Sequence, residues 1–187
     1  NFNNLRLPAG TNCRYQVQAR DAAGNVSSYS AVASATTFSA PPPSTGPVAA
    51  YDLDERFGTT VADWSGHGNA GTINGATWTT QGKSGSALSF SGSSLITVNG
   101  SESLDLVIGM TLEAWVYPTA TSGWSTAIFK EEFHDLAYGL FPSSGVGLPN
   151  VSMITSSGLQ GVDGTSALPL NTWSHLAGTY DGVNLGI

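Results

Sequence analysis

The sequence is poor in cysteine, in charged residues and in lysine, and each shortage excludes a class of structure or partner. Cys13 is the only cysteine among 187 residues, which excludes an internal disulfide framework and a cysteine-rich zinc site. Six lysines and arginines stand against thirteen aspartates and glutamates, giving a net charge of −7. The chain therefore lacks the basic surface that binds nucleic acid or an anionic membrane.

Long apolar runs are also missing. No run approaches the ~18 apolar residues that a membrane-spanning helix needs, so we expect no membrane insertion. The first ten residues lack the charged and apolar regions of a signal peptide, and the sequence does not begin with methionine. We therefore expect the chain to be a segment of a longer protein.

Small and hydroxyl-bearing residues are abundant. Glycine numbers 23, serine and threonine together number 43, and 40% of the residues are hydrophobic. This mixture favours many short strands joined by turns. The expected strands are 48–53, 76–78, 87–90, 95–98, 110–117, 127–130, 136–141, 150–155, 173–180 and one opening at Val183. Because no segment has convincing helical periodicity, the sequence predicts an all-β, antiparallel β-sandwich.

The strand at 110–117 has the clearest pattern. Met110, Leu112, Ala114 and Val116 alternate with polar and aromatic residues, so they share one face of a strand. Pro118 follows and ends the strand, because proline has no backbone N–H for the ladder.

A proline-rich stretch at 38–47, FSAPPPSTGP, divides the chain. Three consecutive prolines favour an extended, semi-rigid linker. Charge also changes here: residues 1–46 hold three arginines and one aspartate, whereas 47–187 hold three basic and twelve acidic residues. We therefore expect two modules, 1–37 and 48–187, joined by a linker at 38–47.

The first module shows strand alternation around Cys13 to Ala19, turn residues at 21–25 and a second strand at 29–37. The segment LPAGTNCRYQVQARDAAGNVS at 7–27 resembles the end of a bacterial fibronectin type III domain. The resemblance implies that residues 1–37 are the last two strands of that sandwich and act as a spacer. Cys13 stands where that family usually has a tyrosine, and we expect it to be a small buried hydrophobe.

The second module resembles the laminin G-like, concanavalin A-like jelly-roll domains of secreted and surface proteins. The resemblance rests on ordered segments: AYDLDE at 50–55, GTTVADWSGHGNAGT at 58–72, GKSGSALSF at 82–90, MTLEAWVYP at 110–118 and LNTWSHLAGTYDG at 170–182. It implies a jelly roll that lacks its C-terminal strands at residue 187. It also implies an extracellular module that binds a glycan or a cell-surface protein.

A glycine-rich turn offers a candidate metal site. Asp63, Gly66 and Asn69 place a carboxylate, a main-chain carbonyl and an amide oxygen close together in sequence. Calcium takes six to eight oxygen ligands, so this turn predicts a partial calcium shell, and the family resemblance implies a structural calcium in many members. An ordinary turn capped by the Asp63 side chain is the alternative.

Aromatic residues in turns are the candidate ligand contacts, because a sugar ring packs its C–H face on an indole or phenol. Trp64, Trp124 and Tyr138 are predicted to lie in or near turns and to bind ligand, with Phe133 a further aromatic there. Trp78, Trp115 and Trp173 lie within expected strands, which favours a role in sheet packing.

Catalytic motifs are missing from the sequence. Glycosidases of the laminarinase type carry a Glu-x-Asp-x-x-Glu strand, and the strand holding Glu113 offers one carboxylate where hydrolysis needs two. We therefore expect a non-catalytic recognition module that targets a larger protein. Two alternatives stay open: an accessory part of a secreted polysaccharide-degrading enzyme whose catalytic domain lies elsewhere, or a stalk module without a ligand.

Overall fold

The computed structural model describes residues 11–36, 46–120, 123–132 and 135–187. The chain divides into two compact units, Asn1–Pro43 and Ser44–Ile187. Most of the expected linker at 38–47 lies outside the described residues, so its conformation is not described further.

The first unit is a two-stranded antiparallel sheet. Strand β1 (Asn12–Tyr15) pairs with β2 (Ala33–Thr36), with Cys13 opposite Ala35. The expected turn is present: the Asp21 carboxylate accepts a hydrogen bond from the Asn25 backbone N–H at 2.9 Å. Both strands are shorter than the sequence predicts, because the flanking residues continue as irregular, exposed chain.

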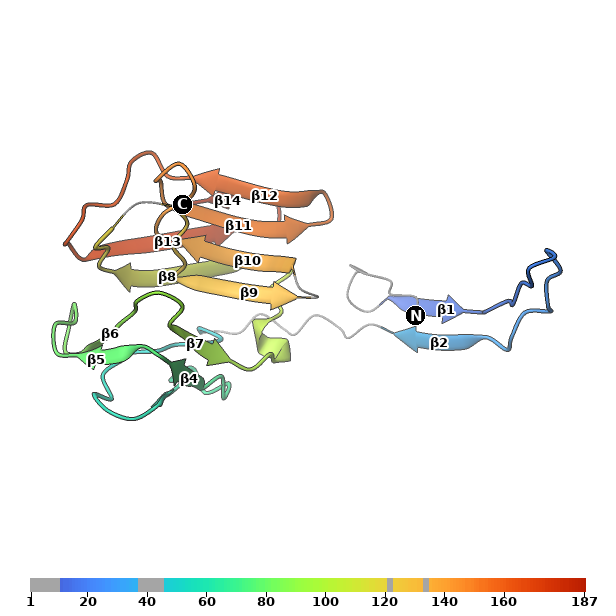
Figure 1. Cartoon of the computed structure of the whole chain (residues 1–187), viewed down its shortest axis with the longest axis horizontal. Helices are drawn as coiled ribbons and strands as arrows, with labels where there is room; N and C mark the ends of the chain where they lie inside the picture. Colours follow the sequence, from blue (N-terminus) through green and yellow to red (C-terminus); the bar gives the residue numbers. More distant parts are fainter. Residues whose placement is uncertain (1–10, 37–45, 121–122, 133–134) are drawn as a thin grey trace. The chain divides into compact units, whose positions relative to one another are not determined.

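The second unit is built of short strands and one turn of 3-10 helix at Glu102–Leu104 (Figure 1). The strands are β3 (Thr60–Val61), β4 (Gly71–Asn74), β5 (Thr77–Thr79), β6 (Ala87–Ser89), β7 (Leu95–Val98), β8 (Met110–Val116), β9 (Ile128–Glu132), β10 (Asp135–Phe141), β11 (Asn150–Thr155), β12 (Gly158–Asp163), β13 (Ser174–Tyr180) and β14 (Leu185–Gly186). Neighbouring strands pair antiparallel, which confirms the all-β, antiparallel architecture.

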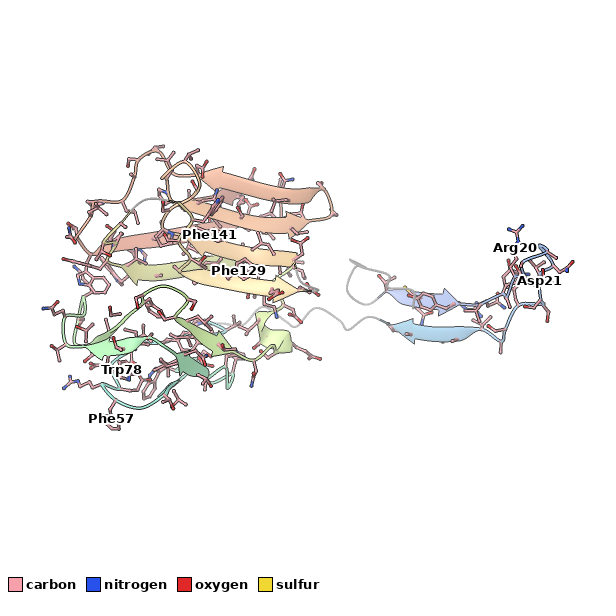
Figure 2. All side chains as sticks on the ribbon, viewed as in Figure 1. Arg20, Asp21, Phe57, Trp78, Phe129 and Phe141 are labelled. Atoms are coloured by element: carbon pink, nitrogen blue, oxygen red, sulfur yellow. The ribbon has the colours of Figure 1, made fainter. Side chains whose placement is uncertain are left out.

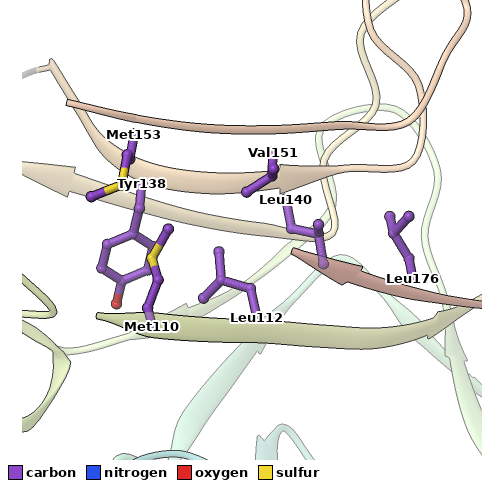
Figure 3. Packing of buried hydrophobic residues seen from close by; sticks show 7 residues of the cluster. All are labelled: Met110, Leu112, Tyr138, Leu140, Val151, Met153 and Leu176. Atoms are coloured by element: carbon purple, nitrogen blue, oxygen red, sulfur yellow. The ribbon is translucent and has the colours of Figure 1, made fainter. Parts of the chain in front are cut away.

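Two sheets form the main sandwich. One has the order β12-β11-β10-β9 and the other β14-β13-β8, while β3-β4-β7 and β5-β6 are smaller sheets of the same unit. The core lies between the two larger sheets (Figure 3). Its buried members are Met110, Leu112, Tyr138, Leu140, Val151, Met153 and Leu176. Met110 and Leu112 are buried while Thr111 and Glu113 are exposed, as the alternation in this strand predicts.

A glycine sets the close approach of these two layers. A Cβ atom on Gly178 of β13 would lie 2.7 Å from Val151 Cγ2 and 3.2 Å from Leu140 Cδ1. Carbon atoms pack at about 3.5–4.0 Å, so any larger residue would push the sheets apart. Because glycine has no side chain, Val151 and Leu140 can pack directly against the β13 backbone at Gly178.

The expected strand at 48–53 is wrong. This segment has no strand pairing, and Leu53 has a left-handed backbone with φ of 55°. The Ala50 backbone forms its hydrogen bonds with the turn at Asp63 instead. Ala50 N–H donates to the Asp63 carboxylate, and Ala50 C=O accepts from the Trp64 N–H. Three strands that the sequence reading omitted, β3, β4 and β12, are present.

Candidate functional site

Two neighbouring rows of side chains on the outer face of the four-stranded sheet point away from the core. The strand register places Phe141, Asn150 and Asp163 opposite one another across β10, β11 and β12. Opposed residues of an antiparallel pair share a face, and Leu140, Val151 and Val162 occupy the inward face between them. The second outward row is Phe129, Gly139, Ser152 and Gly161.

Three aromatic rings form the apolar part of this face. Trp124 meets Phe141 edge-on with ring centroids 5.1 Å apart, and Phe129 meets Phe141 at 6.4 Å. Phe129 and Phe141 are labelled in Figure 2, on the neighbouring strands β9 and β10. Phe141 is buried, whereas Trp124 is 61% and Phe129 51% exposed. The central ring therefore supports two others whose surfaces are open to solvent.

The glycine in the row makes room for the central ring. A Cβ atom on Gly139 would lie 2.7 Å from Phe141 Cε2, closer than carbon atoms can pack. The Phe141 ring therefore lies across the Gly139 backbone, toward Phe129. A side chain at position 139 would push this ring away and break the aromatic cluster.

Trp124 is held by backbone pairing just before the start of β9. Ser125 N–H donates to Ser143 C=O at 2.9 Å, and Ala127 N–H donates to Leu140 C=O at 3.0 Å. These bonds extend the β9–β10 pairing past Phe141 and fix the main chain next to Trp124. The indole is therefore presented by an ordered segment.

Polar groups form the other part of the face. The Ser152 hydroxyl donates to Asn150 Oδ1 at 2.6 Å, and the Asn150 amide donates to Asp163 Oδ1 at 2.9 Å. Asn150 and Ser152 are buried, whereas Asp163 is exposed. Within the described part of the chain, Asp163 Oδ2 has no hydrogen-bond donor. The carboxylate is therefore oriented by Asn150 and keeps one oxygen available to a ligand hydroxyl.

Gly161 lies beside this polar pair and is exposed. A Cβ atom there would lie 2.9 Å from Ser152 Oγ and 3.6 Å from Asn150 Nδ2. The absence of a side chain leaves the surface open next to Asp163. Aromatic rings beside hydrogen-bonding groups are the two elements that bind a sugar, the rings contacting C–H groups and the polar atoms binding hydroxyls.

The Asp63 turn is a separate feature of the same unit. Asp63 Oδ1 accepts the N–H groups of Ala50 at 3.0 Å and Ser65 at 2.9 Å. Its Oδ2 accepts the Ser65 hydroxyl at 2.7 Å and the Asn69 N–H at 2.8 Å. Partial burial alone would raise the Asp63 pKa, but these four hydrogen bonds outweigh it and lower the pKa to about 2.

Asn69 is buried and extends this hydrogen-bond network. Its amide donates to Val48 C=O at 2.7 Å and to the Ser103 hydroxyl at 2.9 Å, while its Oδ1 accepts the Ser101 hydroxyl at 2.6 Å. The Asn69 backbone carbonyl accepts the Tyr51 hydroxyl at 2.5 Å. The turn therefore ties the segment near Val48 to the start of the 3-10 helix.

The predicted calcium ligands do not fit a calcium shell in this arrangement. Gly66 lies in the same turn with φ of 86°, so Asp63, Gly66 and Asn69 are brought into one loop. However, the two Asp63 oxygens accept four protein hydrogen bonds and Asn69 Oδ1 accepts one, so a cation would have to displace donors that these oxygens already face. Among the described residues, no group of three or more His, Cys, Asp or Glu side chains has an arrangement suited to a metal ion.

The expectation that Tyr138 lies in or near a turn is wrong. Tyr138 lies within β10, is 6% exposed and belongs to the core. Its hydroxyl donates to Leu104 C=O at 2.9 Å. Burial, with the nearby charges of Asp105 and Tyr51, raises the pKa of Tyr138 to about 12. Tyr138 thus faces away from the outer surface on which Phe141 lies.

The other predicted ligand aromatics have different positions. Trp64 is 69% exposed beside Asp63, and its indole makes no ring contact with another described residue. Trp124 belongs to the aromatic cluster with Phe141. Phe133 lies outside the described residues. Trp64 and Trp124 as ligand contacts stay predictions, and only Trp124 lies beside other candidate binding groups.

The sequence reading did not select Phe129, Phe141, Asn150, Ser152 or Asp163. A signal existed for part of this set, because 136–141 and 150–155 were expected strands and alternation assigns Phe141 and Asn150 to the faces opposite Leu140 and Val151. The sequence does not predict strand β12, so it gives no strand pairing that would place Asp163 opposite Asn150.

The outer face of the β14-β13-β8 sheet also carries aromatic residues, but they contact one another. Trp115 and His175 are cross-strand partners with ring centroids 5.1 Å apart. The Lys83 ammonium lies 4.6 Å from the Trp115 ring centroid, and His175 Nε2 lies 3.8 Å from Glu113 Oε2. These contacts hold the indole, which is 50% exposed, against its neighbours and stabilise the sheet, as expected for Trp115 in a strand.

The fold is an antiparallel β-sandwich with an aromatic cluster on the outer face of its four-stranded sheet. The family model of the concanavalin A-like lectin/glucanases superfamily matches residues 90–187, just over half of the chain. The chain therefore belongs to that superfamily. The matched region contains β7 to β14 and thus all seven residues of the two outward rows. Neither curated proteins nor solved structures gave a match.

Helices of the described residues are too short and too polar to cross a lipid bilayer. The family match supports a domain of the carbohydrate-binding type.

Proposed function

We propose that this chain is a non-catalytic module that binds carbohydrate through the outer face of the β12-β11-β10-β9 sheet. The observation that carries the proposal is the position of the exposed Trp124 and Phe129 rings beside Phe141, in strand register with Asn150 and Asp163. The chain's membership of the concanavalin A-like lectin/glucanases superfamily supports the same class of ligand.

In this proposal a sugar ring packs its C–H face on Trp124 and Phe129 and directs hydroxyls toward Asp163. Each buried aromatic contact contributes on the order of 1 kcal/mol, and a hydrogen bond to the carboxylate contributes about 1.5–3 kcal/mol. Phe141 and Asn150 act by holding these groups, since Phe141 contacts both rings and Asn150 donates to Asp163. The preformed arrangement reduces the entropy lost on binding.

Recognition without hydrolysis is part of this proposal. Glycoside hydrolysis needs two carboxyl groups about 5–10 Å apart across the scissile bond. Among the seven residues of the two outward rows Asp163 is the one carboxylate, and the next acidic residue on that face of β9, Glu131, follows Phe129 by two positions. A catalytic domain elsewhere in a parent enzyme is compatible with this role, because the module then places that enzyme on its substrate.

The proposal places this recognition outside the cell. The acidic, lysine-poor composition and the paired β units support it, as does the resemblance of residues 7–27 to the end of a fibronectin type III domain. In this role the first unit is a spacer and the second unit holds a larger protein near its target.

The test is binding of the full chain to a panel of polysaccharides and a glycan array. Trp124→Ala and Phe129→Ala are the test variants, and Trp64→Ala is the matched control, because it removes an equally exposed indole next to Asp63. We expect Trp124→Ala and Phe129→Ala each to weaken binding about tenfold or more, while Trp64→Ala binds like the wild type. Circular dichroism confirms the fold of each variant.

Loss of binding in Trp64→Ala alone would move the site to the Asp63 turn and contradict the proposed face. No binding to any glycan would favour a protein ligand or a stalk role. Release of reducing ends from a bound polysaccharide by the purified chain would contradict the non-catalytic part of the proposal.

A further inference from the structure

We infer that the face proposed above selects neutral sugars and rejects uronic and sulfated ones, and that Asp163 is the residue responsible. This inference rests on the proposed function. It adds the ligand's charge class, which neither the fold nor the family match assigns.

The three cations of the second unit lie away from the two outward rows. Arg56 Nε lies 3.3 Å from Asp54 Oδ1, and Lys130 Nζ lies 3.3 Å from Asp105 Oδ1, so two cations have carboxylate partners. Lys83 lies over the Trp115 ring on the other large sheet. Residues 47–187 contain no further lysine or arginine. Each cation is therefore engaged with a residue outside the two outward rows.

The side to which Lys130 points follows from the strand register. Lys130 is opposite Tyr138, which faces the core, while Phe129 beside it in sequence is opposite Gly139. The Lys130 side chain is 19% exposed and is paired with Asp105 on that inner side. It is thus the cation nearest to the aromatic cluster in sequence, yet it projects from the opposite face of β9.

The Asp163 carboxylate favours a ligand that donates hydrogen bonds. Its Oδ1 accepts the Asn150 amide, and its exposed Oδ2 can only accept hydrogen bonds while the carboxylate is ionised. A neutral sugar supplies hydroxyl donors to that oxygen. A uronate or sulfate supplies acceptors and a like charge at that position, which costs free energy when no cation compensates it.

Hydrogen bonds hold the Asp163 carboxylate in its orientation. Asn150 is buried and is itself held by the Ser152 hydroxyl, which donates to Asn150 Oδ1 at 2.6 Å. The hydrogen bond from Ser152 thus fixes the orientation of the Asn150 amide, which in turn donates to Asp163. The repulsion toward an anionic ligand is therefore preorganised in the free protein.

The test compares neutral and acidic glycans printed on one array, followed by titration calorimetry in 20 mM and 500 mM NaCl. The calorimetric probes are cellohexaose, xylohexaose and mannohexaose as neutral ligands, and hexagalacturonate and hexaguluronate as acidic ones. We expect the wild type to bind neutral glycans and to bind the acidic hexamers at least tenfold more weakly at low salt.

Asp163→Asn is the test variant, and Glu102→Gln is the control that removes the same charge from the exposed 3-10 helix. We expect Asp163→Asn to lose affinity for the neutral ligand while its relative affinity for acidic glycans rises about tenfold. We expect Glu102→Gln to match the wild type in its affinity for the neutral ligand and in its relative affinity for acidic glycans. High salt should reduce the preference of the wild type for neutral over acidic glycans.

Three results would overturn the inference. Wild-type binding to acidic glycans that equals or exceeds binding to neutral ones would reject the selectivity and leave the proposed function intact. An unchanged neutral-to-acidic ratio in Asp163→Asn would remove Asp163 from the role given to it. Failure to bind either class would reject the proposed function as well, so the two failures are distinguishable.

Discussion

The Trp124 indole meets the Phe141 ring edge-on, with ring centroids 5.1 Å apart and an interplanar angle of 82°. Edge-to-face pairs are favourable because the positive ring edge of one partner contacts the negative face of the other. The pair connects the interior of the domain to its surface, because Phe141 is buried while Trp124 is exposed. A change at the buried ring should therefore alter the exposed surface.

Phe141→Leu is expected to weaken glycan binding about tenfold and to lower the free energy of unfolding by about 1–2 kcal/mol. The aromatic ring that contacts both Trp124 and Phe129 is lost, so neither exposed ring keeps its position. Calorimetric binding and urea unfolding measure the two effects. Phe129→Leu is the matched control, and should reduce binding with less effect on stability because Phe129 is 51% exposed. Wild-type affinity in Phe141→Leu would contradict the supporting role of Phe141.

Asp63→Asn is expected to lower the free energy of unfolding by about 2–3 kcal/mol at neutral pH. The carboxylate accepts four hydrogen bonds, and an amide in its place presents an N–H₂ group to two of these donors. Urea unfolding measures the loss. Asp52→Asn is the matched control, because Asp52 accepts one hydrogen bond, from Asp54 N–H at 3.3 Å. Equal stability of the two variants would contradict the role given to Asp63.

The same carboxylate predicts a pH dependence of stability. Its pKa is about 2 in the folded protein and 3.8 in the reference state, so the folded state favours the ionised form. Its contribution is therefore fully present above pH 3.8 and is lost as the pH falls toward 2. We expect this contribution to be about 1–2 kcal/mol after solvent screening is considered. Stability measured from pH 6 to pH 2 should fall less in Asp63→Asn than in the wild type.

Calcium is expected to leave the stability of this chain unchanged. A ligand that binds only the folded state raises the melting temperature, but the oxygens of Asp63 and Asn69 already accept hydrogen bonds from the protein. Differential scanning calorimetry with 5 mM calcium and with a chelator measures this. A rise of the melting temperature with calcium that disappears in Asp63→Asn would support the calcium loop predicted from the sequence.

Gly178→Ala is expected to destabilise the second unit by about 1–3 kcal/mol, because the added Cβ would lie 2.7 Å from Val151 and 3.2 Å from Leu140. Gly100→Ala is the matched control, since its nearest neighbour would be Lys130 Nζ at 3.9 Å. Thermal unfolding of both variants measures the difference. A Gly178→Ala variant as stable as Gly100→Ala would show that the two sheets can move apart at no cost.

Several strands follow directly from the sequence. The expected strands at 95–98 and 150–155 match β7 and β11, and the strand at 110–117 ends one residue early, at Val116. In these segments the alternation of apolar and polar residues agrees with the inward and outward faces. Strand β12 was not expected, because Gln160 and Gly161 interrupt its apolar pattern and its pairing with β11 defines it.

The candidate site was less accessible to sequence reasoning. Trp124 could be selected as an aromatic in a turn, but the same criterion selected Tyr138, which is in the core. The distinction depends on which face of β10 each residue occupies and on what lies opposite. Asp163 and Phe141 are more than twenty residues apart, and only the pairing of β10, β11 and β12 places them in one row.

The sequence by itself determined the all-β class, because alternation, turn residues and the near absence of helical periodicity are local properties of the chain. The tertiary structure decided which aromatics are exposed and which carboxylates are satisfied. Asp63 and Asp163 are both aspartates within three residues of a glycine, yet one accepts four protein hydrogen bonds and the other accepts one. That difference arises from residues distant in sequence, since only folding brings Ala50 to Asp63 and Asn150 to Asp163.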